Sequence, residues 1–292
     1  MPLLGAHVSA AGGLAQALYR GKKAGCQVIQ IFTCNPARWH SRDLSESEIE
    51  DFHNAGKDTS VIPVAAHDSY LINMASPRSE IREKSFTAFL NEMKRAEVLL
   101  IPYVVMHPGS HMGEGEKAGI EHISDSLKKI VDMTGDSHVK ILLETTAGQG
   151  NNLGYSFEQL GRIIEQTDAP ERMGICMDTC HVFAAGYDFR TAVTYNELIR
   201  RFDETIGLHF LKLFHLNDSK KDCGSRVDRH EQLGHGFIGK EALALFLRDP
   251  RFNDLPFLIE TPKGKNDKGI DWDVANLDLL RSLCCSGPQV QK

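Results

Sequence analysis

Short runs of apolar residues recur along the chain, and each run is followed by a polar side chain. Eight such runs occupy residues 3–6, 28–32, 61–66, 103–106, 139–143, 173–177, 211–214 and 255–259. They are rich in Val, Ile and Leu, and most do not alternate apolar with polar residues. This pattern is typical of strands in a parallel sheet, where helices cover both faces. We therefore predict eight buried strands.

The segments between these runs are predicted to be helices. They cover residues 12–24, 45–54, 80–99, 117–133, 157–166, 195–205, 239–248 and 274–283. Ser45 and Glu48 have the spacing of a capping box at the start of the second helix. From His7 to Glu260, seven intervals span 253 residues, or about 36 each, which is the length of one βα unit.

Eight βα units in one chain predict an α/β fold of the TIM (β/α)8 barrel type. No linker or low-complexity tract interrupts the pattern, so residues 1–292 are expected to form a single domain, with an irregular tail after about residue 284. A composition of 41% hydrophobic and 25% charged residues is that of an ordinary globular protein.

Charge and cysteine content narrow the function classes. The formal charge of −6 gives no general basic signature for nucleic-acid binding, so a polyanion would need a local site. No apolar run is long enough to span a membrane, and the N-terminus lacks the features of a signal peptide. The seven cysteines are scattered and odd in number, which indicates a reducing compartment. We expect a cytoplasmic protein without a membrane partner.

The polar residues at the strand ends suggest a metal site. In a TIM barrel the carboxyl ends of the strands form the active site. His7 follows the first run, and six of the other seven runs also end at a His, Asp or Glu, namely His67, His107, Glu144, Asp178, His215 and Glu260. A single such residue is more commonly a helix cap or a satisfied buried group, but six are hard to attribute to capping. Imidazole and carboxylate ligands suit zinc, with manganese or iron as alternatives, and the number exceeds what one ion needs.

Three further residues extend this set. His181 follows Asp178 by three residues, and the long polar loop after the seventh run contains Asp228 and His230. Two residues apart in an extended segment, these side chains share a side and can hold another metal together with His181. Without the other strand ends, a solvated loop would be the better interpretation. Cys176 and Cys180 have no second cysteine pair and are interpreted as small buried residues.

Taken together, these motifs resemble the endonuclease IV family, the zinc-dependent apurinic/apyrimidinic-site endonucleases of base-excision repair. The similar stretches cover nearly the whole chain and are residues 5–9 (GAHVS), 67–73 (HDSYLIN), 107–110 (HPGS), 144–150 (ETTAGQG), 177–181 (MDTCH), 215–219 (HLNDS), 224–230 (GSRVDRH) and 260–262 (ETP).

The resemblance implies three zinc ions, with manganese as an alternative at one site. The ligands of the first would be His67, His107 and Glu144. Glu144 would bridge to the second, which is completed by Asp178, His215 and Glu260. The third would be held by His181, Asp228 and His230, while His7 would lie beside the ligands without being one. Glu144, Asp178 and Glu260 would also take part in catalysis.

The implied reaction is hydrolysis of the phosphodiester bond 5′ to an abasic site in double-stranded DNA. It leaves a 3′-hydroxyl and a 5′-deoxyribose phosphate, and the family also removes 3′ blocking groups. Four carboxylates and three divalent ions give the site a charge of roughly +2, which can hold a phosphate despite the net charge of the chain. A metal-bound hydroxide would be the nucleophile. The protein is expected to act as a monomer, associated with the nucleoid through DNA.

The resemblance also implies DNA contacts, with two departures from the family pattern. Tyr70 and Leu71 resemble residues that wedge into the duplex, and further contacts are expected from Asn35, Arg38, Lys220, Arg226 and Arg229. The family usually has an arginine where this chain has Ala37, one position before Arg38. It also usually has Gly-Glu-Gly where this chain has His235 between two glycines.

Two other functions compete with this interpretation. A sugar isomerase or epimerase of the same barrel superfamily would hold one divalent metal with Glu144, Asp178, His215 and Glu260. It would have no use for the ligand set formed by His181, Asp228 and His230. A binder of DNA lesions without catalysis would lack at least one of the nine ligands, and none is missing.

Overall fold

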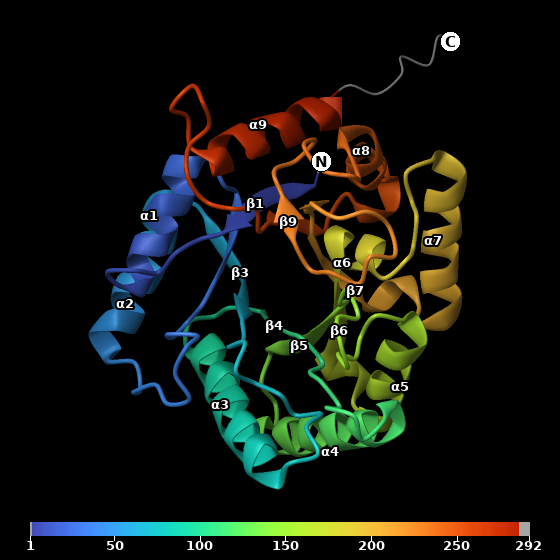
Figure 1. Ribbon diagram of the computed structural model, residues 1–292. Coiled ribbons are helices and arrows are strands. Elements are labelled where there is room, and N and C mark those ends of the chain that lie inside the picture. Colours follow the sequence, from blue (N-terminus) through green and yellow to red (C-terminus); the bar gives the residue numbers. More distant parts are fainter. Residues whose placement is uncertain (1, 286–292) are drawn as a thin grey trace.

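The computed structural model describes residues 2–285, and its centre is a closed parallel barrel (Figure 1). Its strands are β1 (Leu3–His7), β2 (Val28–Ile31), β3 (Ile62–His67), β4 (Tyr103–Met106), β5 (Lys140–Glu144), β6 (Met173–Asp178), β7 (Leu211–His215) and β10 (Pro256–Ile259). Neighbours around the barrel follow chain order, and β10 closes it by pairing with β1. The predicted TIM barrel is confirmed, and all eight apolar runs form its strands.

Helices surround the barrel. They are α1 (Leu14–Ala24), α2 (Glu46–Thr59), α3 (Ser79–Val98), α4 (Glu116–Thr134), α5 (Phe157–Thr167), α6 (Thr179–Ala184), α7 (Ala192–Thr205), α8 (Lys240–Arg248) and α9 (Trp272–Cys285). In α5 the buried residues include Leu160, Ile163, Ile164 and Thr167, which is the spacing of one helix face. The capping box predicted for α2 is present, with Ser45 and Glu48 bonded to each other's backbone.

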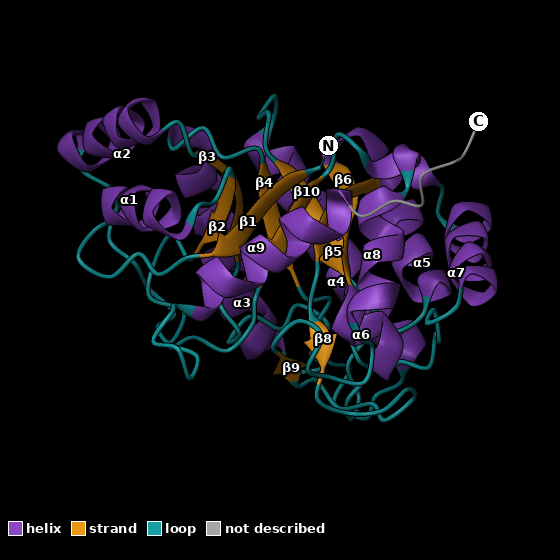
Figure 2. Cartoon of the chain, turned by 90° about the horizontal axis from the view of Figure 1, so that it is seen from above, coloured by secondary structure: helices purple, strands orange, loops and turns teal. Residues whose placement is uncertain are grey.

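Two features after β6 and β7 are absent from the sequence prediction. The short helix α6 begins directly at the end of β6, and a hairpin of β8 (Asp218–Ser219) and β9 (His230–Glu231) occupies the long polar loop. A helix of six residues and strands of two residues each are too short to produce a recognisable hydrophobic period in the sequence. Figure 2 shows β8, β9 and the long loops together beyond one end of the barrel strands.

The apolar core has two parts, one inside the barrel and one between the strands and the helices. The inner part consists of Val28, Val64, Ala65, Val105, Leu142, Cys176, Leu213 and Leu258. It fills the barrel below the polar strand ends, so those ends rest on a packed floor. Cys176 and Cys180 are both fully buried, as predicted.

Two remaining expectations concern the termini and membranes. The irregular tail predicted after about residue 284 falls mainly on residues 286–292, which lie outside the described residues, while α9 continues to Cys285. Within residues 2–285, no helix combines the length and the apolar character needed to cross a bilayer.

Candidate metal centre

The polar ends of β3, β4 and β5 converge on Glu144. Nε2 of His67 lies 3.0 Å from Oε2 of Glu144, and Nε2 of His107 lies 3.1 Å from the same oxygen. The three side chains offer ligand atoms that lie within 4.8 Å of one another. This is the first of the predicted ligand groups, and Glu144 at its centre is completely buried.

A second group forms around the other oxygen of Glu144. Nδ1 of His215 lies 3.1 Å from Oε1 of Glu144 and 3.3 Å from Oε2 of Glu260. Together with Asp178 these residues offer four ligand atoms within 4.8 Å of one another. Glu144 therefore turns one oxygen toward each group, which is the geometry that a bridging carboxylate requires.

The third group lies between α6 and the β8–β9 hairpin. Oδ2 of Asp228 is 3.2 Å from Nε2 of His181, and Oδ1 of Asp228 is 3.5 Å from Nε2 of His230. Asp178 also approaches this group, since its Oδ2 lies 3.5 Å from Nε2 of His230. Asp178 is thus close to both the second and the third group, whereas the sequence pattern associated it with the second alone.

A thiol lies closer to the third group than the sequence indicated. Sγ of Cys180 is within 4.8 Å of ligand atoms of Asp228 and His230, and it donates to the carbonyl oxygen of Arg229 at 3.6 Å. Burial raises the pKa of the Cys180 thiol to about 12. The thiol is therefore neutral as long as no metal ion lies beside it.

The histidines of the third group fit a metal ion. Nδ1 of His181 lies 2.8 Å from the carbonyl oxygen of Thr145, and Nδ1 of His230 lies 3.1 Å from that of Glu260. Since a carbonyl only accepts, each Nδ1 donates, and Nε2 is the atom that faces the Asp228 carboxylate. Both Nε2 atoms are buried and lack a hydrogen-bond partner among residues 2–285. A metal ion between these nitrogens and the carboxylate would satisfy both.

The electrostatics of the site favour positive charge throughout. Burial alone would raise the pKa of the Glu144 carboxyl, but His215 and His107 beside it hold that pKa well below its ordinary value. Burial lowers the pKa of His181, yet the charges of Asp178 and Asp228 outweigh it and raise that pKa well above the ordinary value. Glu144 is therefore ionised, and the ring of His181 holds a proton that a bound metal ion would displace.

Asp178 also has the structural role that an acid at a strand end commonly has. Its Oδ1 accepts from the backbone N–H of His181 at 2.8 Å and caps α6. Its Oδ2 accepts from Nδ2 of Asn217 at 2.6 Å, and Oδ1 of Asn217 accepts from the N–H of Glu260. Capping and metal binding are compatible here, because the two oxygens serve different partners.

Sequence reasoning missed Asp218, which holds the loop after β9 in place. Its carboxylate is fully buried and accepts from the backbone N–H groups of Gly234, Gly236 and Ile238 at 2.9–3.1 Å. Asp218 belongs to the HLNDS motif, but its role could not be predicted from that motif. The N–H groups that donate to its carboxylate lie 16 to 20 residues further along the chain. His235, in the same loop, packs edge-on against the ring of Trp272 with centroids 5.5 Å apart.

His7, which the resemblance places beside the metal without making it a ligand, contacts Glu260 and Phe32. Its Nδ1 is 3.3 Å from Oε1 of Glu260, and its ring packs against Phe32 with centroids 4.5 Å apart. Sequence reasoning gave no role to Gln30, although its amide contacts His7, Glu260 and His215. Its only signal was one polar residue inside an apolar run.

The loops around the metal centre carry the residues predicted to contact DNA. Tyr70 is 70% exposed and lines, with the ligands, a pocket of about 370 Å³. Leu71 beside it is half-buried. The hydroxyl of Ser69 donates to the carbonyl oxygen of Pro36 at 2.5 Å, so this loop is tied to the loop that follows β2. The latter exposes Asn35 and Arg38.

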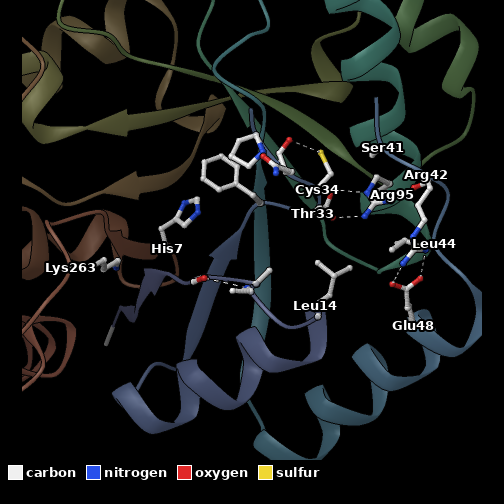
Figure 3. Close-up of a pocket in the computed structure, with 17 residues that line it drawn as sticks. His7, Leu14, Thr33, Cys34, Ser41, Arg42, Leu44, Glu48, Arg95 and Lys263 are labelled. Atoms are coloured by element: carbon white, nitrogen blue, oxygen red, sulfur yellow. Dashed lines mark hydrogen bonds and ion pairs between the residues drawn. The ribbon is translucent and has the colours of Figure 1, made fainter. Parts of the chain in front are cut away.

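A second cavity of about 740 Å³ lies on the other side of His7 and Phe32 (Figure 3). Its wall is fixed by Arg95 of α3, whose guanidinium donates to the hydroxyl and carbonyl oxygens of Thr33. The buried carboxylate of Glu92 accepts from the Thr33 hydroxyl at 2.5 Å and from the Cys34 thiol at 2.7 Å. These contacts anchor the start of the loop after β2 to α3.

The basic residues near the third group are exposed. Arg226 lies over the ring of Tyr155, 4.2 Å from its centroid, and Arg229 donates to the carbonyl oxygen of Asp228 at 2.6 Å. Lys220 lies 3.9 Å from Glu231. The structure brings these three to the loop and hairpin of the third ligand group, while Asn35 and Arg38 lie on a different loop.

The chain is similar to known proteins over nearly its whole length. A family model described as "Xylose isomerase-like TIM barrel" matches residues 18–283. A curated protein of Chloroflexus aurantiacus, named "Probable endonuclease 4", is 48% identical over 283 residues, which are 97% of this chain and 98% of that protein. The chain belongs to the endonuclease IV family.

Solved structures agree with this membership. The crystal structure of endonuclease IV from Thermus thermophilus superposes on this chain with a TM-score of 0.85, and the two sequences are 34% identical. The match covers 98% of this chain and 100% of the Thermus chain. A D-tagatose 3-epimerase-like protein has a TM-score of 0.73, but at 19% identity it shows a shared fold alone. The family resemblance predicted from the sequence motifs is confirmed.

Proposed function

We propose that this protein is a metal-dependent DNA repair endonuclease. It hydrolyses the phosphodiester bond 5′ to an abasic site, leaving a 3′-hydroxyl and a 5′-deoxyribose phosphate, and it removes 3′ blocking groups. The observation that carries the proposal is the third ligand group, in which Nε2 of His181 and Nε2 of His230 both face the Asp228 carboxylate, at 3.2 and 3.5 Å. A single-metal isomerase has no use for it. Family membership supports the same assignment.

The metal centre proposed here holds three zinc ions, with manganese as an alternative at one. Its nine ligands are His67, His107, Glu144, Asp178, His181, His215, Asp228, His230 and Glu260. When bound, such ions lower the pKa of water and neutralise charge on a phosphate. The support from the chain is the pair of oxygens of Glu144, one facing each of the first two groups.

Protein groups then orient the reaction. Burial alone would raise the pKa of Glu260, but His215 beside it holds that pKa well below its ordinary value. Glu260 is therefore an anion at neutral pH and is suited to orient the attacking water or accept its proton. Asp178 reaches both the second and the third group, so it can couple the attacking and leaving sides of the phosphate.

Substrate recognition is proposed to rest on the surrounding loops. An abasic nucleotide has no base pair to break, which lowers the cost of turning it out of the duplex. The exposed ring of Tyr70, followed by Leu71, is suited to fill the space left in the stack. Asn35, Arg38, Lys220, Arg226 and Arg229 would contact the backbone. We further propose that the protein acts as a monomer in the cytoplasm, on DNA of the nucleoid.

The proposal is tested with a DNA duplex that contains one tetrahydrofuran abasic analogue. We expect a nick on the 5′ side of the analogue without added magnesium, loss of nicking after prolonged chelation, and recovery with zinc or manganese. The same duplex without the analogue is the substrate control. Glu144→Ala should abolish nicking, whereas Glu204→Ala, on the exposed face of α7, should not alter it.

Two results would contradict the proposal. An intact duplex after incubation with metal-replete protein would exclude the nuclease. Epimerisation of a ketose by that same sample would favour the sugar epimerase instead. The metal content per chain separates the two, because three ions are expected for the nuclease and one for the isomerase.

A further inference from the structure

Gln30 has a buried side-chain amide whose partners among residues 2–285 all belong to the metal centre or lie beside it. It is 0% exposed and sits in β2, two residues above Val28, which belongs to the apolar floor inside the barrel. Its Nε2 lies 2.7 Å from Oε1 of Glu260 and 2.9 Å from Nδ1 of His7, and its Oε1 lies 3.0 Å from Nε2 of His215. Both N–H groups and the carbonyl oxygen of this side chain therefore have a partner.

The partners fix the orientation of the amide. An ionised Glu260 only accepts, so the group 2.7 Å from its Oε1 must be the NH₂ of Gln30. The carbonyl oxygen of Gln30 therefore faces His215. Because that oxygen only accepts, Nε2 of His215 carries the hydrogen and donates it to Gln30.

This assignment determines which nitrogen of His215 can bind a metal. With the hydrogen on Nε2, the lone pair of the neutral ring is on Nδ1. Nδ1 lies between Oε1 of Glu144 at 3.1 Å and Oε2 of Glu260 at 3.3 Å, and both oxygens are acceptors. In the neutral ring this position is therefore lined by three lone pairs, and a metal ion bound there would take the place of a proton on Nδ1.

Gln30 also divides the two oxygens of Glu260 between two tasks. Oε1 receives the hydrogen bond from Gln30, and Oε2 is the oxygen that faces His215. The second N–H of the amide is directed at Nδ1 of His7, so this nitrogen acts as an acceptor and does not donate to Glu260. Glu260 Oε2 is left for the metal.

We propose that Gln30 is a positioning residue of the second metal group. It selects Nδ1 of His215 as the ligating nitrogen and orients Glu260 so that Oε2 binds the metal. The inference rests on the metal centre of the proposed function, but it does not depend on the substrate. A partner that fixes the tautomer of a ligating histidine is typically worth about 10–100-fold in metal affinity.

The test compares Gln30→Met with Gln159→Met. Both replace a buried amide by a side chain of similar length, but Gln159 lies on α5 and accepts from the N–H of Gly154. In zinc-loaded Gln30→Met, one zinc per chain should pass to a chelator about 10–100-fold faster than in the wild type. The other zinc ions, and all zinc in Gln159→Met, should leave at the wild-type rate. Release at the wild-type rate from a folded Gln30→Met would overturn the proposal.

A measurement on the wild type keeps the proposal testable if Gln30→Met does not fold. Nitrogen-15 spectra of the zinc-loaded protein should show His215 protonated at Nε2 and bound to metal through Nδ1. Protonation at Nδ1, or a wild-type chain that binds no zinc, would overturn it. Wild-type protein that holds zinc but leaves abasic DNA intact would contradict the proposed function and leave the metal-release result valid.

Discussion

At the scale of single residues, Asp178 and Asn217 form the contact on which two ligand groups depend. Asp178 caps α6 through Oδ1 and accepts from Nδ2 of Asn217 through Oδ2, and Asn217 in turn holds the backbone of Glu260. A substitution of Asp178 therefore changes both its hydrogen bond with Asn217 and the negative charge beside the ligand groups. The two effects can be separated by exchanging the residues.

Asp178→Asn alone should lose both stability and nicking. The new NH₂ group would face Nδ2 of Asn217 across a contact of 2.6 Å, and unmade buried hydrogen bonds cost about 1–3 kcal/mol. The double variant Asp178→Asn with Asn217→Asp restores a donor and an acceptor, so denaturant unfolding of the metal-free proteins should show recovery. Nicking should not recover, because the carboxylate has moved away from the metal groups. A double variant that nicks like the wild type would show that only the hydrogen bond matters.

At the scale of elements, the β8–β9 hairpin connects the loop chemistry to the barrel. His230 is the first residue of β9, and β8 begins with Asp218, whose carboxylate is enclosed by backbone N–H groups of residues 234–239. The position of the third ligand group thus depends on how closely this loop approaches Asp218. Gly236 sets that approach, since a Cβ there would lie 2.4 Å from Oδ1 of Asp218 and from the carbonyl oxygen of Ser219.

Gly236→Ala should therefore weaken the third metal group before the other two. The added methyl group must displace the loop or the Asp218 carboxylate, and such overpacking typically costs about 1–3 kcal/mol. We expect one zinc per chain to be lost on dialysis, with two retained, as measured by metal analysis. Gly56→Ala in α2 is the control, because nothing beyond the backbone of its own helix lies within 4 Å of the place its methyl group would take, and the helix favours alanine. Equal retention of three zinc ions by both variants would contradict this dependence.

At the scale of the whole molecule, the sequence predicted the barrel more fully than it predicted the site. The eight strands repeat one signal at regular spacing, so each supports the others, and the six acids and histidines at their ends follow from the fold. Gln30 and Asp218 could not be found this way. Gln30 contacts His215, which is 185 residues away, and Asp218 accepts from N–H groups that are 16 to 21 residues away. The local hydrophobic period of a sequence does not indicate such contacts. The contact of Asp178 with the third ligand group was missed for the same reason. His230 reaches Asp178 only because α6 and the β8–β9 hairpin bring the two residues together in the folded chain.

The distribution of the ligands over the barrel predicts how metal removal affects stability. Six of the eight barrel strands, all except β1 and β2, contribute or directly precede a proposed ligand. Ions that bind only the folded state stabilise it, by about 2.7 kcal/mol for one site at a free concentration of 100 times Kd. Chelated protein should therefore unfold at a temperature lower by roughly 5 °C or more, and the midpoint should rise again with added zinc. Because the apolar floor of the barrel contains none of the proposed ligands, circular dichroism at 25 °C should be unchanged. An unfolding midpoint that does not depend on zinc would mean that the strand ends are held together without metal.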